Sequence, residues 1–246
     1  MKQLILWGAS YLLLLMCGCR PPEGEQQVQP AENPTPSFNH STSPDIITVD
    51  PDFDRLSLAD FEKFHADDGT WVEEGGMLIC SGVPRGYLYS KASYRDFTFR
   101  GEYQFVLTED QKKQQNKANT GFMVAIQSPH QVWPVSLEVQ GSYGKMGSIN
   151  TNGGLPRVKM TDLSDVRERV RLPVDQWNAV EIVMRAGKIT SRLNGEIVCT
   201  SEATELKEGP IGLQAEGYVV RFRNLRIRRD TDGESSVPED AAAPAK

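Results

Sequence analysis

The 246-residue chain is poor in the residues that build metal and redox centres, with only three histidines and four cysteines. No pair of cysteines has the spacing of a zinc motif. Basic residues are also too few for a general nucleic-acid binder, because 27 Lys and Arg face 33 Asp and Glu, a net charge of −6. Residues 46–229 hold equal numbers of acidic and basic side chains, so the acidic surplus lies in the flanking segments. We therefore expect a neutral ligand to suit this domain at least as well as a charged one.

Long apolar runs are missing as well. The longest, residues 4–16, has 13 residues behind Lys2, which is short for a permanent membrane-spanning helix. It predicts a signal peptide over residues 1–18. The following Cys19 comes after Gly18 and resembles the lipidated cysteine of a bacterial lipoprotein, although Met16 and Cys17 make that motif imperfect. The expected protein is exported and held at the membrane by a lipid on Cys19, facing the periplasm or cell surface, with ordinary secretion or a retained membrane anchor as the alternatives.

Both ends of the remaining chain lack apolar residues to bury. Residues 19–45 are rich in Pro, Glu, Gln, Ser and Thr and predict a disordered tether. Residues 230–246 are acidic and small, and predict a disordered tail. One domain over residues 46–229 is left. Its two cysteines, Cys80 and Cys199, could pair in an oxidising compartment or stay as buried thiols.

Helical patterns are nearly absent from this domain. Apolar residues alternate with polar ones, most clearly over 97–105, which is typical of half-buried strands. Asn194-Gly195 between two such runs predicts a type I′ hairpin. A short charged stretch over 161–171 is the one helical candidate. These features predict an all-β fold, an antiparallel two-sheet β-sandwich with at most one short helix. Besides residues 97–105, nine further runs predict strands: 76–80, 87–90, 121–127, 135–140, 177–184, 188–193, 196–199, 211–214 and 218–227.

A series of short motifs follows in a fixed order along this domain. They are Phe61, Trp71, YRDF (94–97), NTGF (119–122), VWP (132–134), LEVQG (137–141), QWN (176–178), LNG (193–195), EGPIGLQ (208–214) and VRFRNLRI (220–227). In this order they resemble the bacterial 3-keto-disaccharide hydrolase domain family. Thr120 stands where the family usually has Ser, a change that keeps the hydroxyl group. The resemblance implies a concanavalin A-like jelly roll, carbohydrate bound across its concave face, and action on sugars oxidised at C3.

The strand predicted at 135–140 carries the best candidate for a catalytic group. Its alternation sends Leu137 and Val139 to one face and Ser136, Glu138 and Gln140 to the other. A ketone at C3 acidifies the proton on C2, so one base can start an elimination across C2 and C1, and water then completes hydrolysis. We expect Glu138 to be that base. The alternative is an exposed face without function.

The other candidates surround this strand. Gln140, Asn119 and Ser136 could bind substrate hydroxyls, and Trp133 could stack on a sugar ring or pack as a corner. His130, in a loop with two prolines, could donate a proton, or hold a divalent cation together with Glu138, or simply be exposed. The sequence indicates no other cofactor. The expected partner is an oligosaccharide or oxidised disaccharide, and the alternative function is a non-catalytic carbohydrate-binding module or a structural surface domain.

Overall fold

The computed structural model describes residues 50–230, so the predicted signal peptide, Cys19, the tether and all but the first residue of the tail lie outside the described residues. Sheet A has nine strands, in the order β10 (Met160–Asp162), β13 (Glu196–Ser201), β12 (Lys188–Leu193), β11 (Asn178–Arg185), β6 (Phe97–Val106), β15 (Val219–Arg229), β4 (Met77–Cys80) and β3 (Trp71–Glu74), with β1 (Asp54–Arg55) paired to β15. Sheet B has six, in the order β2 (Phe61–Phe64), β5 (Gly86–Ser90), β14 (Gly212–Ala215), β7 (Gly121–Val124), β8 (Ser136–Gln140) and β9 (Ile149–Asn152).

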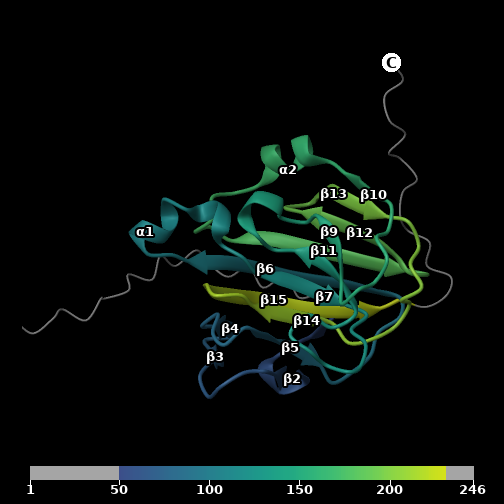
Figure 1. The fold of residues 1–246 in the computed structure, drawn as a ribbon, viewed down its shortest axis with the longest axis horizontal. Coiled ribbons are helices and arrows are strands. Elements are labelled where there is room, and N and C mark those ends of the chain that lie inside the picture. The colour runs from purple at the N-terminus through teal and green to yellow at the C-terminus, as the bar shows by residue number, and fades with distance from the viewer. Residues whose placement is uncertain (1–49, 231–246) are drawn as a thin grey trace, which may run out of the picture. The chain divides into compact units, whose positions relative to one another are not determined.

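Every strand pair in both sheets is antiparallel. Strands distant in sequence lie side by side, as β6 and β15 do in the middle of sheet A (Figure 1). The predicted antiparallel sandwich of the jelly-roll class is confirmed. All ten predicted strands are present, whereas β1, β2, β3, β9 and β10 were not predicted.

Helices are few and short. Helix α2 (Ser164–Val170) lies within the predicted helical stretch, and α1 (Glu109–Lys112) adds one helix to the single one expected. The four residues of α1 form one turn because the Thr108 side chain accepts a hydrogen bond from the Gln111 amide, a capping arrangement that starts a helix. Three 3₁₀ turns complete the set: η1 (Leu58–Asp60), η2 (Gln115–Lys117) and η3 (Tyr143–Lys145). No helix within residues 50–230 is long and apolar enough to cross a lipid bilayer.

The core fills the space between the two sheets. The alternating aromatics of β6 supply much of it, since Phe97, Phe99, Tyr103 and Phe105 are all buried. From sheet B, Phe122 meets them, with its ring centroid 5.9 Å from Phe99 and 5.3 Å from Tyr103. The alternation in the sequence therefore has the predicted consequence, because one face of β6 is turned toward sheet B.

Two smaller predictions are also met. Asn194 and Gly195 have φ values of 48° and 94°, as a type I′ turn between β12 and β13 requires. Cys80 and Cys199 are buried free thiols, and burial raises the pKa of Cys80 to about 12. They lie on β4 and β13, five strand spacings apart in sheet A, or about 24 Å, so they cannot form a disulfide without unfolding.

Asp230, the last residue that the structure describes, is bonded to the strands of sheet A. The Asp230 carboxylate pairs with Arg185 and Arg228 and accepts a hydrogen bond from the Thr98 hydroxyl, 3.0 Å away. Its side chain is almost wholly buried by these contacts. The ordered domain thus includes one residue that the sequence assigns to the tail.

Candidate functional site

Strand β8 separates the core from a polar cavity. Leu137 and Val139 are fully buried between the sheets. Glu138 and Gln140, on the opposite face of sheet B, line a cavity of about 1050 Å³. This volume reaches the upper end of ordinary ligand sites. Glu138 is not on an exposed face, as the alternative had it, because the residue is only 5% exposed.

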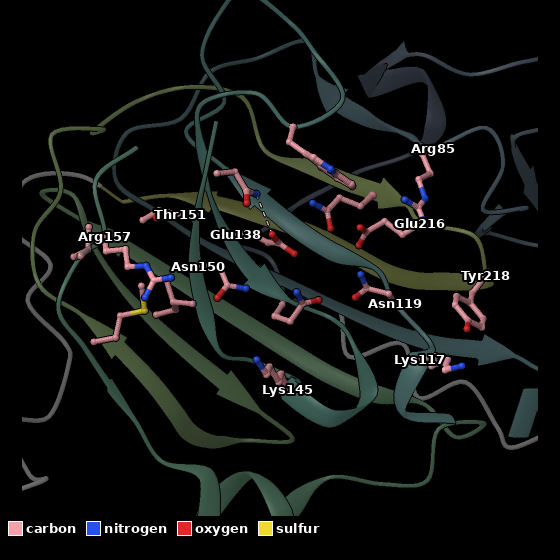
Figure 2. A pocket seen from close by; sticks show the side chains of 17 residues that line it. Arg85, Lys117, Asn119, Glu138, Lys145, Asn150, Thr151, Arg157, Glu216 and Tyr218 are labelled. Atoms are coloured by element: carbon pink, nitrogen blue, oxygen red, sulfur yellow. Dashed lines mark hydrogen bonds between the residues drawn. The ribbon is translucent and has the colours of Figure 1, made fainter. Parts of the chain in front are cut away.

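The cavity has a floor of strands and a wall of loops (Figure 2). Its floor comes from β8, from β9 and from the end of β14. Loops that precede or follow the strands of sheet B supply most of the wall. The main polar residues lining it are Arg85, Lys117, Asn119, Glu138, Gln140, Lys145, Asn150, Thr151, Asn152, Arg157, Gln214 and Glu216. Trp133 and Tyr218 add aromatic rings to the lining.

Glu138 lies on the floor and is held by two side-chain amides. Asn152 of β9 donates from Nδ2 to Glu138 Oε2 at 2.9 Å, the dashed line in Figure 2. Burial is the main influence on Glu138 and raises its pKa, whereas hydrogen bonds from Asn152 and Gln214 act in the opposite direction. The two amides therefore limit the rise in the pKa of Glu138 that burial causes.

Each of the three residues 119–121 has a different structural role beside the cavity. Asn119 lines the cavity, and its buried Oδ1 has no hydrogen-bond partner. The Thr120 hydroxyl, 2.8 Å from the Gln214 carbonyl oxygen, ties this segment to β14, so the hydroxyl that the sequence comparison singled out has a structural use. A Cβ on Gly121 would overlap Gln214 Oε1 and lie 2.5 Å from Glu138 Oε1. Gly121 thus leaves the room in which these two side chains meet.

The structure brings four predicted site residues together in the cavity: Glu138, Gln140, Asn119 and Trp133. Gln140 Oε1 accepts a hydrogen bond from the Ser142 amide at 2.9 Å. Ser136 does not line the cavity. Its fully buried hydroxyl donates to the Pro134 carbonyl oxygen at 3.1 Å, so it braces the loop before β8.

His130 lies outside the cavity lining. Its Nδ1 is 2.8 Å from the Tyr87 hydroxyl, and its ring centroid is 4.2 Å from that of Tyr89. Phe64 packs on the same ring at 5.9 Å. Tyr87 is paired directly with Gln214, so this aromatic cluster covers the neighbouring part of the same sheet face. The structure does not place His130 beside Glu138 in the cavity.

Most of the lining residues were not predicted from the sequence as site residues, and four polar ones stand out among them. Asn150 and Asn152 come from β9, an unpredicted strand, while Gln214 and Glu216 come from the end of β14. A signal for the last two was available, since Gly212, Gln214 and Glu216 are spaced by two and so share one face. Gln214 is 1% exposed, and its Oε1 has no hydrogen-bond partner.

Glu216 is the second carboxylate of the cavity. Burial raises its pKa, the nearby Glu138 raises it further and Arg85 lowers it, with a result of about 7. Figure 2 shows Arg85 and Glu216 on one side of the cavity, with Glu138 across from them. Two like charges that influence each other in one cavity tend to have separate pKa values, as an acid and a base require.

Basic side chains stand around the opening of the cavity. Four of them, all exposed, come from separate segments: Arg85, Lys117 at the end of η2, Lys145 at the end of η3, and Arg157. Lys117 donates a hydrogen bond to Gln114 Oε1 at 2.7 Å. These cations offset the charge of the two carboxylates and offer donors to an oxygen that becomes negative during a reaction.

A bound metal would need several acidic, histidine or cysteine ligands. Within residues 50–230, no group of three or more His, Cys, Asp or Glu side chains is placed to hold a metal ion. His130 and Glu138 therefore lack a third ligand of these types in the described part of the chain.

The sequence of residues 50–228 matches the sequence model of the 3-keto-alpha-glucoside-1,2-lyase-like domain family. The chain belongs to this family. The match covers the whole cavity, including residues that the sequence alone did not single out, such as Gln214 and Glu216. The resemblance noted from the ordered motifs is confirmed by this membership.

Solved structures share the fold of this lyase-like domain. Two proteins from Parabacteroides distasonis, each titled a "putative glycosyl hydrolase", align with TM-scores of 0.54 and 0.50 at 18% and 16% identity. The first alignment covers 72% of this chain and 99% of the other protein, and the second covers 70% and 89%. The carbohydrate-binding module CBM66 from Bacillus subtilis aligns more loosely, with a TM-score of 0.48 at 12% identity, over 69% of this chain and 95% of the module. No curated protein matches the chain.

Proposed function

We propose that this protein cleaves 3-keto-glycosides, such as 3-keto-disaccharides, by a base-initiated elimination followed by addition of water. The observation that carries the proposal is Glu138, a carboxylate buried on the floor of a polar cavity and kept ionisable by two amides. Burying a carboxylate costs free energy unless it is paired and hydrogen-bonded, and groups that carry such a cost are concentrated at functional sites. The family name, which refers to a 1,2-lyase acting on a 3-keto-glucoside, supports the elimination half of this reaction.

In this mechanism Glu138 removes the proton on C2 of the oxidised sugar. The electron pair of that C–H bond becomes part of an enolate with the C3 oxygen, and the enolate expels the oxygen attached to C1. Asn119, Gln140 and Trp133 line the cavity. In the proposed complex the two amides donate hydrogen bonds to the substrate and the Trp133 ring stacks on a sugar ring. The proposal gives His130 no chemical step, because it lies outside the cavity lining.

A carbohydrate-binding module without catalysis is the second candidate. The side-chain amides of the cavity and the Trp133 ring would suit it, because hydroxyl groups are recognised by such donors, acceptors and aromatic faces. Glu138 and Glu216 distinguish the two readings. A site that only binds gains little from two interacting carboxylates in one cavity, whereas acid–base chemistry uses them.

The Glu138→Gln variant tests the catalytic proposal. We expect release of free sugars from a 3-keto-disaccharide to fall by about a hundredfold or more, the usual contribution of a positioned general base. The variant should stay folded, because Gln keeps the shape of the side chain. Sugar release is measured with and without added divalent cations and chelator. Unchanged turnover in the variant would remove Glu138 from the mechanism, and binding of glycan without any release by the unmodified protein would favour the module.

We further propose that the protein is exported and anchored through a lipid on Cys19, on the basis of the apolar run and the cysteine that follows Gly18. The Cys19→Ser variant should move from the membrane fraction to the soluble fraction. The matched variant Cys17→Ser should stay in the membrane fraction. Fractionation that gives the opposite pair of results would assign the lipid to Cys17.

A further inference from the structure

Glu216 is a carboxylate in the cavity that the base-initiated mechanism does not yet use. It follows β14 on the same side as Gln214, and both side chains line the cavity. Its Oε2 is buried without a hydrogen-bond partner, and so is Oε1 of Gln214, whose side chain is 99% buried. Buried polar atoms without partners are rare in folded proteins, and in a cavity they mark positions where a ligand can bond.

The surroundings of the two carboxylates favour different protonation states. Amides of Asn152 and Gln214 bond to Glu138 and support its charge. Glu216 has no such bond at Oε2 and is influenced by the charge of Glu138 from across the cavity, while Arg85 alone acts in the opposite direction. Burial and the charge of Glu138 raise the pKa of Glu216 to about 7, so this carboxyl holds its proton for part of the time near neutral pH, as a proton donor must.

We propose that Glu216 is the proton donor to the departing glycosidic oxygen. This inference rests on the proposed function and completes it. Glu138 takes the C2 proton, the C1–O bond breaks with its electron pair going to the oxygen, and Glu216 gives its proton to that oxygen. The products of this half are a free alcohol and a sugar with a C1–C2 double bond conjugated to the C3 ketone.

The same pair can complete hydrolysis. Water adds to C1 of the unsaturated sugar, and the Glu216 carboxylate accepts the proton that the water loses. Glu138 returns a proton to C2. The balance is one water consumed, and both carboxyl groups end in the states in which they began.

Two substrates that differ in their leaving group test this role. In the disaccharide the leaving group is a hydroxyl oxygen of the second sugar, which leaves poorly unless it receives a proton. In the nitrophenyl substrate it is 4-nitrophenolate, which leaves readily as the anion. We expect Glu216→Gln to lower kcat/KM for a 3-keto-disaccharide by about a hundredfold or more, and for 4-nitrophenyl 3-keto-glucoside by less than about threefold. Glu138→Gln should lose activity on both substrates. Glu196→Gln, which changes an exposed side chain on β13, should lose activity on neither.

The pH dependence of the unmodified protein gives a second test that needs no variant. A donor must be protonated, so the rate on the disaccharide should fall as the pH rises above about 7, and this limb should be missing for the nitrophenyl substrate. Equal losses on both substrates in folded Glu216→Gln, no loss on the disaccharide, or the same limb with both substrates would each overturn the role of Glu216. Failure of the proposed function looks different, because the unmodified protein would then cleave neither substrate.

Discussion

Individual residues of the cavity give two chemically identical side chains different surroundings. Glu138 meets the amides of Asn152 and Gln214, while Glu216 leaves Oε2 unpartnered opposite it. The strand pattern 135–140 was sufficient to predict the face on which Glu138 lies. Its partners could not be predicted, because Asn152 comes from a strand with almost no apolar residues and Gln214 comes from a distant part of the chain.

Glu216 should make the stability of the protein depend on pH. Its pKa is raised from 4.5 to about 7 in the folded state, so between these values the folded protein binds more protons than the unfolded chain. Stability contributed by the neutral form is present below pH 4.5 and is lost as the pH rises through 7. We expect Glu216→Gln to be more stable than the unmodified protein at pH 8, by up to about 3 kcal/mol, with a much smaller difference at pH 4.5.

Urea unfolding of both proteins at each pH measures this difference. Glu196→Gln is the control, because its side chain is exposed and should give the same small difference at both pH values. A Glu216→Gln effect of equal size at pH 4.5 and pH 8 would contradict an ionisation cost at this position.

Elements determine how the side chains meet. Strand β7 contributes a glycine at the point where the side chains of its two neighbours, β14 and β8, approach one another. Strand β9 supplies two asparagines to the floor, and it was missed because its segment, Ile149–Asn152, has polar residues on both faces and glycines on either side. The short strands β2 and β3, each at the edge of a sheet, were missed because four residues carry too little alternation to predict a strand.

Gly121→Ala should lower activity without unfolding the domain. The added methyl group would displace Gln214 and Glu138, and a catalytic group that moves by about 1 Å can lose a hundredfold in rate. We expect kcat/KM on a 3-keto-disaccharide to fall by at least about tenfold. The matched variant Gly144→Ala should keep full activity, since a Cβ there has no atom within 4 Å. Equal activity of the two variants would show that the site tolerates crowding between β14 and β8.

At the scale of the whole molecule, one sheet face serves two purposes. The face of sheet B turned away from sheet A carries the catalytic candidates on one part and an aromatic cluster with Tyr87, Tyr89 and His130 on the other. The sandwich could be predicted from the sequence because apolar and polar residues alternate along long strands such as β6. This alternation indicates which face of the strand is buried. The sequence did not predict which residues of this face line the cavity and which join the aromatic cluster. A loop histidine such as His130 has the same local sequence pattern whether it packs on aromatic rings or contacts a substrate.

The central claim is that this domain cleaves glycosides only after oxidation at C3. The most direct test gives the purified protein two disaccharides in parallel, one with a ketone at C3 and the other its unoxidised parent, and follows release of the monosaccharides. The account predicts release from the 3-keto-disaccharide alone, because only there is the C2 proton acidic enough for Glu138. Release from both sugars at similar rates, or from neither, would contradict it.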